Sequence, residues 1–133
     1  MVELLAGTGI HTVVVARRRD RLDALAERFA DVEVLEADLT TAEGLAAVEA
    51  RVCSSEQPVD LLVNNAGVAS KPGRDVPIWE SVREDWEFVM NINVTGLVLC
   101  CKAVLPGMIA RKYGRIVNIA SIAGKEGNPK MAP

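Results

Sequence analysis

Small polar segments follow two of the apolar runs in this chain, where a folded sheet would present them to a ligand. Asn64-Asn65-Ala66-Gly67 comes after VDLLV, and Ser121 comes after RIVNIA. Because Asn and Gly tolerate unusual backbone dihedrals, the first segment is either a turn or a place where the main chain approaches a ligand closely. A serine at a strand end could position the hydroxyl or carbonyl oxygen of a substrate.

Charged residues end two other apolar runs. Arg17 follows TVVVA directly, with no acidic residue before Asp20, and Asp38 lies next to the end of VEVLEADL. In dinucleotide sites an acidic residue at this strand end selects a free ribose 2′-hydroxyl, whereas Arg accommodates a 2′-phosphate. The pattern therefore favours NADP, with NAD as the alternative. The other interpretation makes Arg17 part of a solvated turn and Asp38 a surface carboxylate or helix cap. As a ligand contact, Asp38 would accept hydrogen bonds from an adenine amino group.

Other polar residues suggest further chemistry. Asn93 lies between two helical stretches and predicts either a kink or a functional amide, since Asn is poor inside helices. Ser121 is not expected to be a nucleophile, because the first glycine of the G-x-S-x-G pattern is missing and no histidine follows it. Gly7-Thr8-Gly9 precedes a strand rather than following one, so it predicts the end of a helix and not a phosphate-binding loop.

Strands and helices alternate along the chain. We expect strands at 12–16, 32–39, 59–63 and 115–120. Helices are expected around 22–29, from a cap at Thr40 to about 52, around 82–90 and around 94–111. Thr40 and Glu43 have capping-box spacing for the second of these helices. Such alternation predicts parallel βαβ units. The fold class is therefore α/β, with a Rossmann-like, doubly wound parallel sheet between two helical layers, in a single domain over 1–133.

Composition excludes several classes of function. The chain has 133 residues, 50% of them hydrophobic, and a net charge of −3 without a basic block, which argues against nucleic-acid or anionic-membrane partners. Three cysteines and one histidine have no metal-ligand spacing, so we predict no metal. No uninterrupted apolar run of about 18 residues and no signal peptide is evident, and reduced cysteines fit a cytoplasmic protein.

Together these segments resemble the short-chain dehydrogenase/reductase family, most closely its 3-oxoacyl-[acyl-carrier-protein] reductase-like branch. The matching segments are Asp38-Leu39, Asn64–Gly67, Asn93–Gly96 and Gly114–Ser121, in the family's order. The resemblance implies transfer of a hydride between a nicotinamide cofactor and a carbonyl or alcohol substrate. It assigns catalytic roles to Ser121, which would hold the substrate oxygen, and Asn93, which would anchor a proton-relay water.

The cofactor contacts that the resemblance implies, beside Arg17, are Asp38 and Leu39 at the adenine and a second group after the third expected strand: Asn65, Ala66 and Gly67. It also implies a homodimer or homotetramer, in which the helix at 94–111 pairs between subunits. The alternative function is a non-catalytic nucleotide-binding or interaction module derived from the same fold.

The sequence departs from the family pattern at both ends. The glycine-rich loop and the first strand before it are absent, which predicts an incomplete sheet with a gap between the strands at 12–16 and 59–63. The family's catalytic tyrosine would fall one place after Pro133, and the single tyrosine, Tyr113, has no lysine four residues on. We therefore expect the isolated chain to be a catalytically inactive fragment of its parent enzyme.

Overall fold

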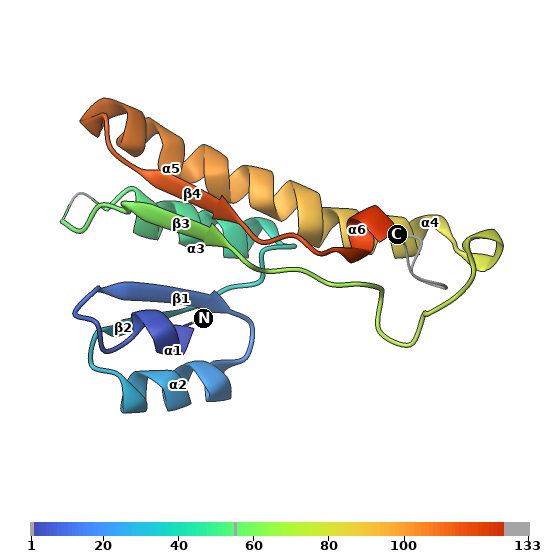
Figure 1. Cartoon of the computed structure of the whole chain (residues 1–133), viewed down its shortest axis with the longest axis horizontal. Coiled ribbons are helices and arrows are strands. Elements are labelled where there is room, and N and C mark those ends of the chain that lie inside the picture. The colour runs from blue at the N-terminus through green and yellow to red at the C-terminus, as the bar shows by residue number, and fades with distance from the viewer. Residues whose placement is uncertain (1, 55, 127–133) are drawn as a thin grey trace. The chain divides into compact units, whose positions relative to one another are not determined.

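The computed structural model describes residues 2–54 and 56–126. Its chain divides into two compact units, residues 1–51 and 52–133 (Figure 1), and each is described by itself. The prediction of a single domain stays a prediction.

The first unit is a β-α-β arrangement. Its elements are α1 (Val2–Leu5), β1 (Thr12–Ala16), α2 (Arg19–Arg28), β2 (Val32–Glu36) and α3 (Ala42–Val52). Strands β1 and β2 are parallel, in a register that pairs Thr12 with Val32 and Ala16 with Glu36. Helix α2 makes the crossover and packs on both strands. Leu22, a residue of this helix, is only 1% exposed. The βαβ unit predicted from the apolar pattern is therefore present.

The glycines near the start of the chain form the predicted turn. Gly7 and Gly9 both have positive φ angles, of 82° and 79°. This left-handed backbone favours glycine because other residues carry a Cβ that clashes there. The two residues thus end α1 and lead the chain into β1, which excludes a phosphate-binding loop that opens a helix.

The second unit repeats the parallel pairing with a longer crossover. Strand β3 (Leu61–Asn64) is parallel to β4 (Arg115–Asn118), with Leu61 paired to Arg115 and Asn64 to Asn118. Between them lie a 3₁₀ turn, η1 (Ile78–Glu80), helix α4 (Arg83–Met90), a π-helical segment, η2 (Asn91–Gly96), and helix α5 (Leu97–Arg111). A short helix, α6 (Ala123–Glu126), follows β4.

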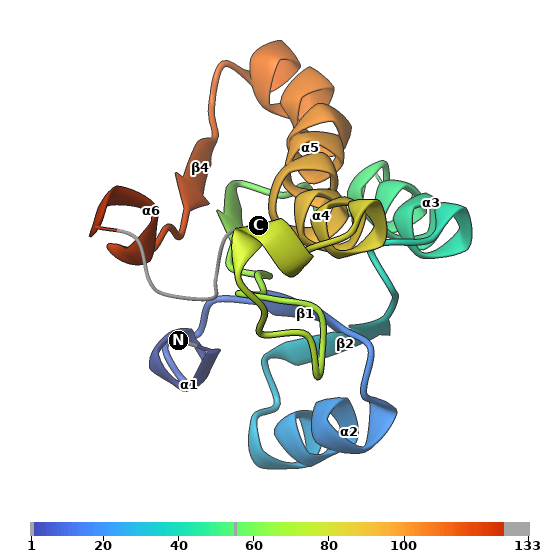
Figure 2. The same ribbon diagram turned by 90° about the vertical axis from the view of Figure 1, so that its right-hand side faces the viewer.

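Helices α4 and α5 are continuous through η2, where we had expected two separate helical stretches (Figures 1 and 2). The core of this unit is the face of α5 that carries Cys100, Val104 and Met108, all buried. Helix α5 packs against β3. These contacts make the helix a structural support of the second sheet.

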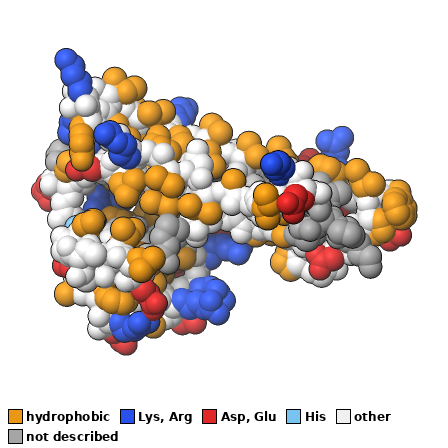
Figure 3. Space-filling model, in the orientation of Figure 1, with side chains coloured by type: hydrophobic (Ala, Val, Ile, Leu, Met, Phe, Trp, Pro, Cys, Tyr) orange, Lys and Arg blue, Asp and Glu red, His pale blue; other side chains and the backbone are white. Residues whose placement is uncertain are grey.

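The opposite face of the continuous helix is apolar and exposed. Hydrophobic side chains are also visible on the side of the second unit that Figure 3 presents. Exposed apolar side chains recur along the helix one or two turns apart: Trp86, Met90, Val94, Val98, Leu105 and Ile109. A row spaced by four residues drifts by about 40° per step in an α-helix. The wider π-helical turn at η2 counteracts this drift. One side of the helix therefore stays apolar along its length.

The continuous helix also has a property that was not expected of its two parts. From Arg83 to Arg111 it is long and apolar enough to cross a membrane, judged by length and composition alone. The sequence did not predict this long apolar helix, because the segment was expected to divide at Asn93. Core helices of soluble proteins pass the same test, and this one carries buried side chains that pack within its own unit.

Strand edges remain open in the part of the chain that the structure describes. There β1 is hydrogen-bonded to β2 alone and β3 to β4 alone, so β1 and β3 share no ladder. The gap predicted between these two strands stays a prediction. Four strand boundaries differ from expectation: β2 ends at Glu36, β3 begins at Leu61 and ends at Asn64, and β4 ends at Asn118.

Candidate functional site

Arg17 and Asp38 meet at the carboxyl edge of the first strand pair. Arg17 directly follows β1, and the ladder continues one step past β2 because Ala37 donates its N–H to the carbonyl of Ala16 at 3.0 Å. Asp38 is thereby brought beside Arg17, and its Oδ2 lies 4.0 Å from Arg17 Nη1. The Arg17 side chain is 59% exposed, so its guanidinium can also reach a ligand from solvent.

Asp38 is held as a carboxylate by the turn that follows it. Its Oδ1 accepts hydrogen bonds from the Thr40 N–H at 2.9 Å and the Thr40 hydroxyl at 2.7 Å. These bonds, with a smaller contribution from Arg17, lower the pKa of Asp38. Asp38 is therefore an acceptor at neutral pH, as recognition of an amino group requires. Leu39, half-buried, lies inside the same turn.

Helix α3 begins one residue later than the capping-box spacing predicted. Thr41, not Thr40, is the capping residue, because its Oγ1 accepts the N–H of Gly44 at 3.0 Å. The third residue after this cap is Gly44, which has no side chain to complete a capping box. Thr40 instead donates its hydroxyl to Asp38. The prediction of Thr40 paired with Glu43 was wrong because Asp38 competes for the Thr40 hydroxyl.

The second unit places Asn64 to Gly67 directly at the end of β3. Asn64 Nδ2 donates to Asn118 Oδ1 on the neighbouring strand at 2.9 Å and to Cys101 Sγ on α5 at 3.3 Å. The Ile119 N–H donates to the Asn64 carbonyl at 2.9 Å. The strand end is thus tied to both neighbouring elements, and Asn65, Ala66 and Gly67 leave the sheet from a fixed point.

Asn93 clasps the loop that follows Gly67. Its Nδ2 donates to the Val68 carbonyl at 2.8 Å, and its Oδ1 accepts the Val68 N–H at 2.9 Å. A Cβ on Gly67 would lie 3.5 Å from Asn93 Oδ1, in ordinary contact. Asn93 lies within the π-helical segment η2, and such segments are frequent at functional sites. The helix is therefore irregular at Asn93, and the Asn93 amide binds the main chain of Val68. A functional role of this amide stays a prediction.

Ser121 and Tyr113 lie at opposite ends of β4. Ser121 follows the carboxyl end, is exposed, and accepts the Ala123 N–H on its Oγ at 3.1 Å as α6 begins. Tyr113 precedes the amino end, is 58% exposed, and has the Arg115 guanidinium 5.7 Å from its ring. Within this unit, Ser121 is therefore at the sheet edge where ligands bind in open α/β folds.

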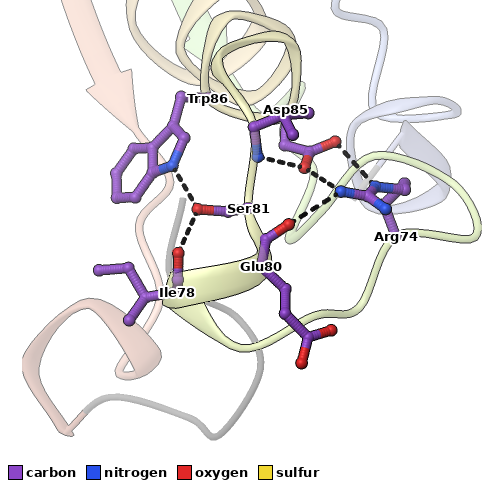
Figure 4. A network of polar contacts seen from close by, with 7 residues as sticks. Arg74, Ile78, Glu80, Ser81, Asp85 and Trp86 are labelled. Carbon is purple, nitrogen blue, oxygen red and sulfur yellow. Dashed lines mark hydrogen bonds and ion pairs between the residues drawn. The ribbon is translucent and has the colours of Figure 1, made fainter.

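An ion pair between half-buried Arg74 and buried Asp85 fixes the loop between β3 and α4 (Figure 4). Arg74 donates to both carboxylate oxygens of Asp85, at 3.2 and 2.8 Å, and to the Glu80 carbonyl at 3.2 Å. Asp85, only 2% exposed, also accepts the Val82 N–H at 3.0 Å and so caps α4. Beside them, Trp86 Nε1 donates to the Ser81 hydroxyl, which donates to the Ile78 carbonyl.

Sequence reasoning missed several of these positioning residues. Four of them had no predicted role beyond the elements or motifs that contain them: Thr41, Asn118, Arg74 and Asp85. For Asn118 a signal did exist, because LLVN and RIVN end with the same residue and parallel strands bring such ends together. The partners of Arg74 could not be found in this way, since the ion pair depends on the path of an irregular loop.

The parallel strand pairs and the polar residues at their carboxyl ends define the class of fold. It is a Rossmann-like α/β nucleotide-binding fold, of which the chain covers a part. The model of the short chain dehydrogenase family matches residues 1–133. The chain therefore belongs to the short-chain dehydrogenase/reductase family.

Relatives of known name agree with this assignment. A 2-dehydro-3-deoxy-L-rhamnonate dehydrogenase (NAD(+)) of Sphingomonas is 39% identical over 83% of this chain and 44% of its own. A 3-oxoacyl-[acyl-carrier-protein] reductase of Synechocystis is 37% identical over 96% of this chain and 52% of its own. A short-chain dehydrogenase of Sphingobium yanoikuyae, solved with NADPH, has a TM-score of 0.78 at 38% identity, over 90% of this chain and 47% of its own. The chain spans about half the length of these relatives.

Replacing Asn93 by Ala should free the loop at Val68. A hydrogen bond of this kind contributes about 1 kcal/mol, so we expect the Val68 amide to exchange with solvent about fivefold faster, measured by NMR hydrogen exchange. Asn91→Ala is the matched control, because Asn91 is exposed in the same π-helical segment and should leave Val68 unchanged. Unchanged exchange at Val68 in Asn93→Ala would contradict the clasp.

The Arg74–Asp85 pair should make the second unit sensitive to acid. Hydrogen bonds from Arg74 and Val82 lower the pKa of Asp85 from 3.8 to about 2. A depressed pKa stabilises the fold fully above the unfolded value and loses this contribution as pH falls towards the folded value. We expect Trp86 fluorescence to report loosening between pH 3.8 and about 2. Asp85→Asn should show no transition in that range, and an identical acid transition in both proteins would contradict the assignment.

Proposed function

We propose that the complete protein is an NADP-dependent oxidoreductase that transfers a hydride between the nicotinamide cofactor and a carbonyl or alcohol substrate. The 133 residues would supply much of its cofactor-binding part. The observation that carries the proposal is the pairing of β1 with β2, which sets the exposed Arg17 beside the ionised Asp38 at one sheet edge. Membership of the family adds the reaction class, because the named relatives are dehydrogenases and reductases.

The described residues fit an adenine dinucleotide with a 2′-phosphate. Arg17 can pair with the phosphate through a charge-assisted contact, which is among the stronger kinds of hydrogen bond. Asp38, kept as a carboxylate by Thr40, can accept from the adenine amino group, with Leu39 beside it in the turn. Asn65, Ala66 and Gly67 are small enough for the main chain to approach the cofactor. Among the named relatives one uses NAD(+) and another was solved with NADPH. Because the relatives differ in cofactor, we base the preference for NADP over NAD on Arg17.

Two further residues support a catalytic rather than a purely binding role. Asn93 is held by Val68 in a π-helical turn, where it could anchor a water molecule for proton relay. Ser121 presents a hydroxyl at the end of β4, where it could hold the substrate oxygen. A bound nicotinamide cofactor would supply the hydride donor or acceptor. The acid/base is not among these 133 residues, because Val117 stands four places after Tyr113, so we propose that the isolated chain is inactive.

Replacing Arg17 by Ala in the complete protein tests the proposal. The lost contact to a charged phosphate should raise the KM for NADPH about tenfold and leave the KM for NADH within about twofold. Arg21→Ala is the matched control, because Arg21 is an exposed arginine on α2 and should change neither value. An equal effect of Arg17→Ala on both cofactors would show that Arg17 is only a surface charge. Cofactor binding without turnover of any carbonyl by the complete protein would favour a non-catalytic binding module.

The exposed apolar face of the continuous helix supports the homodimer or homotetramer that the family resemblance implies. A face of this extent is unfavourable in water unless it is covered. We expect the complete protein to sediment as a dimer or tetramer, and Val98→Glu on this face to shift it towards monomers. Arg83→Glu, at an already polar position of the same helix, should leave the assembly unchanged. A monomeric wild-type protein in sedimentation velocity would contradict the proposal.

A further inference from the structure

The turn that carries Asp38 is fastened to helix α3 by one hydroxyl group. Thr41 Oγ1 donates to the Asp38 carbonyl at 3.0 Å and accepts the Gly44 N–H at 3.0 Å. The Thr41 N–H also donates to the same carbonyl at 3.1 Å. A helix cap needs only the bond to Gly44. The second bond joins the first turn of α3 to the main chain of Asp38.

Gly44 brings the helix against the same turn from the other side. A Cβ at Gly44 would overlap the Asp38 carbonyl oxygen and would lie 2.6 Å from the Asp38 carbonyl carbon and 2.8 Å from its nitrogen. These are main-chain atoms, which cannot rotate away as the end of a flexible side chain can. Any side chain at this position would therefore displace the main chain of Asp38 or the start of α3.

The direction of the Asp38 carboxylate depends on this main-chain position. Its Oδ1 is taken up by Thr40, through the N–H and the hydroxyl. Its Oδ2 remains on the side of Arg17, 4.0 Å from Nη1. A shift of the turn would move the carboxylate and the ion pair together, because Thr40 and Asp38 belong to the same few residues of main chain.

We propose that Thr41 and Gly44 are positioning residues for the adenine end of the cofactor site. The Thr41 hydroxyl and the bare Cα of Gly44 hold Asp38 and Leu39 where they meet the adenine ring. This inference rests on the proposed function, since it takes Asp38 as a cofactor contact. Neither residue touches the cofactor in this account; each acts through the main chain of Asp38.

The test uses two probes that need only the first unit. Adenosine 2′,5′-bisphosphate carries the adenine and a 2′-phosphate, and 5′-AMP differs from it only in lacking the 2′-phosphate. Their Kd values for the 133-residue chain are measured by NMR titration. Thr41→Val should raise both Kd values by the same factor, about fivefold, because the capping hydroxyl no longer holds the main chain of Asp38. Arg17→Ala should weaken the bisphosphate alone, which separates adenine positioning from phosphate contact.

Conservative and matched variants distinguish positioning from general damage. Thr41→Ser keeps the hydroxyl and should bind within about twofold of wild type. Thr12→Val makes the same substitution at the other end of β1, where the hydroxyl donates to the Ile10 carbonyl, and should leave both Kd values unchanged. Gly44→Ala should weaken both probes at least as much as Thr41→Val. Gly124→Ala, with open space around the added Cβ, should have no effect.

The outcomes separate this inference from the function on which it rests. Failure of the wild-type chain to bind either probe would overturn the proposed cofactor site and the positioning role with it. Wild-type binding that Thr41→Val leaves unchanged, or that Thr41→Ser fails to restore, would overturn the positioning role alone. Loss of the folded circular dichroism signal in Thr41→Val would also overturn it, because the hydroxyl would then support the whole unit rather than the Asp38 turn.

Discussion

Parallel pairing of neighbouring strands is the constraint on which the candidate site depends. In each unit two strands run in the same direction, so both carboxyl ends open at one edge of their sheet. A parallel pair requires a long crossover, and the helices α2 and α5 both make that crossover and cover the strands. Most of the residues that could do chemistry lie at or just after a strand end, whereas Asn93 lies in the π-helical segment η2.

Hydrogen bonds made by polar side chains then hold the loops at the strand ends in place. Asp38 is fixed by Thr40, Asn64 by Asn118 and Cys101, and Asn93 by Val68. Each bond satisfies a polar group near the end of regular structure, where the ladder no longer does so. The same residues thus hold the loops in place and present groups to a ligand. A substitution at one of them is expected to change shape and binding together.

The apolar pattern predicted the fold well and the local contacts poorly. The run TVVVA became β1 at its expected limits, and the residues after each strand lie at the expected edges. Periodicity could not show that η2 makes α4 and α5 continuous, because a π-helical turn has no distinct apolar spacing. Nor could it choose between Thr40 and Thr41 as the cap, since the choice depends on where the Asp38 carboxylate lies. The partners of Arg74 follow from a loop path that no pattern encodes.

The location of bound cofactor on the chain tests the central claim most directly. In an NMR titration of the isotopically labelled chain with NADP+, we predict that the perturbed amides lie at the carboxyl edges, at 17–18, 38–40 and 65–67. The amides at the amino ends of the strands, beside His11 and Gly114, should stay unchanged. Perturbations concentrated at those amino ends, or spread evenly over the chain, would contradict the assignment of these edges as the nucleotide site.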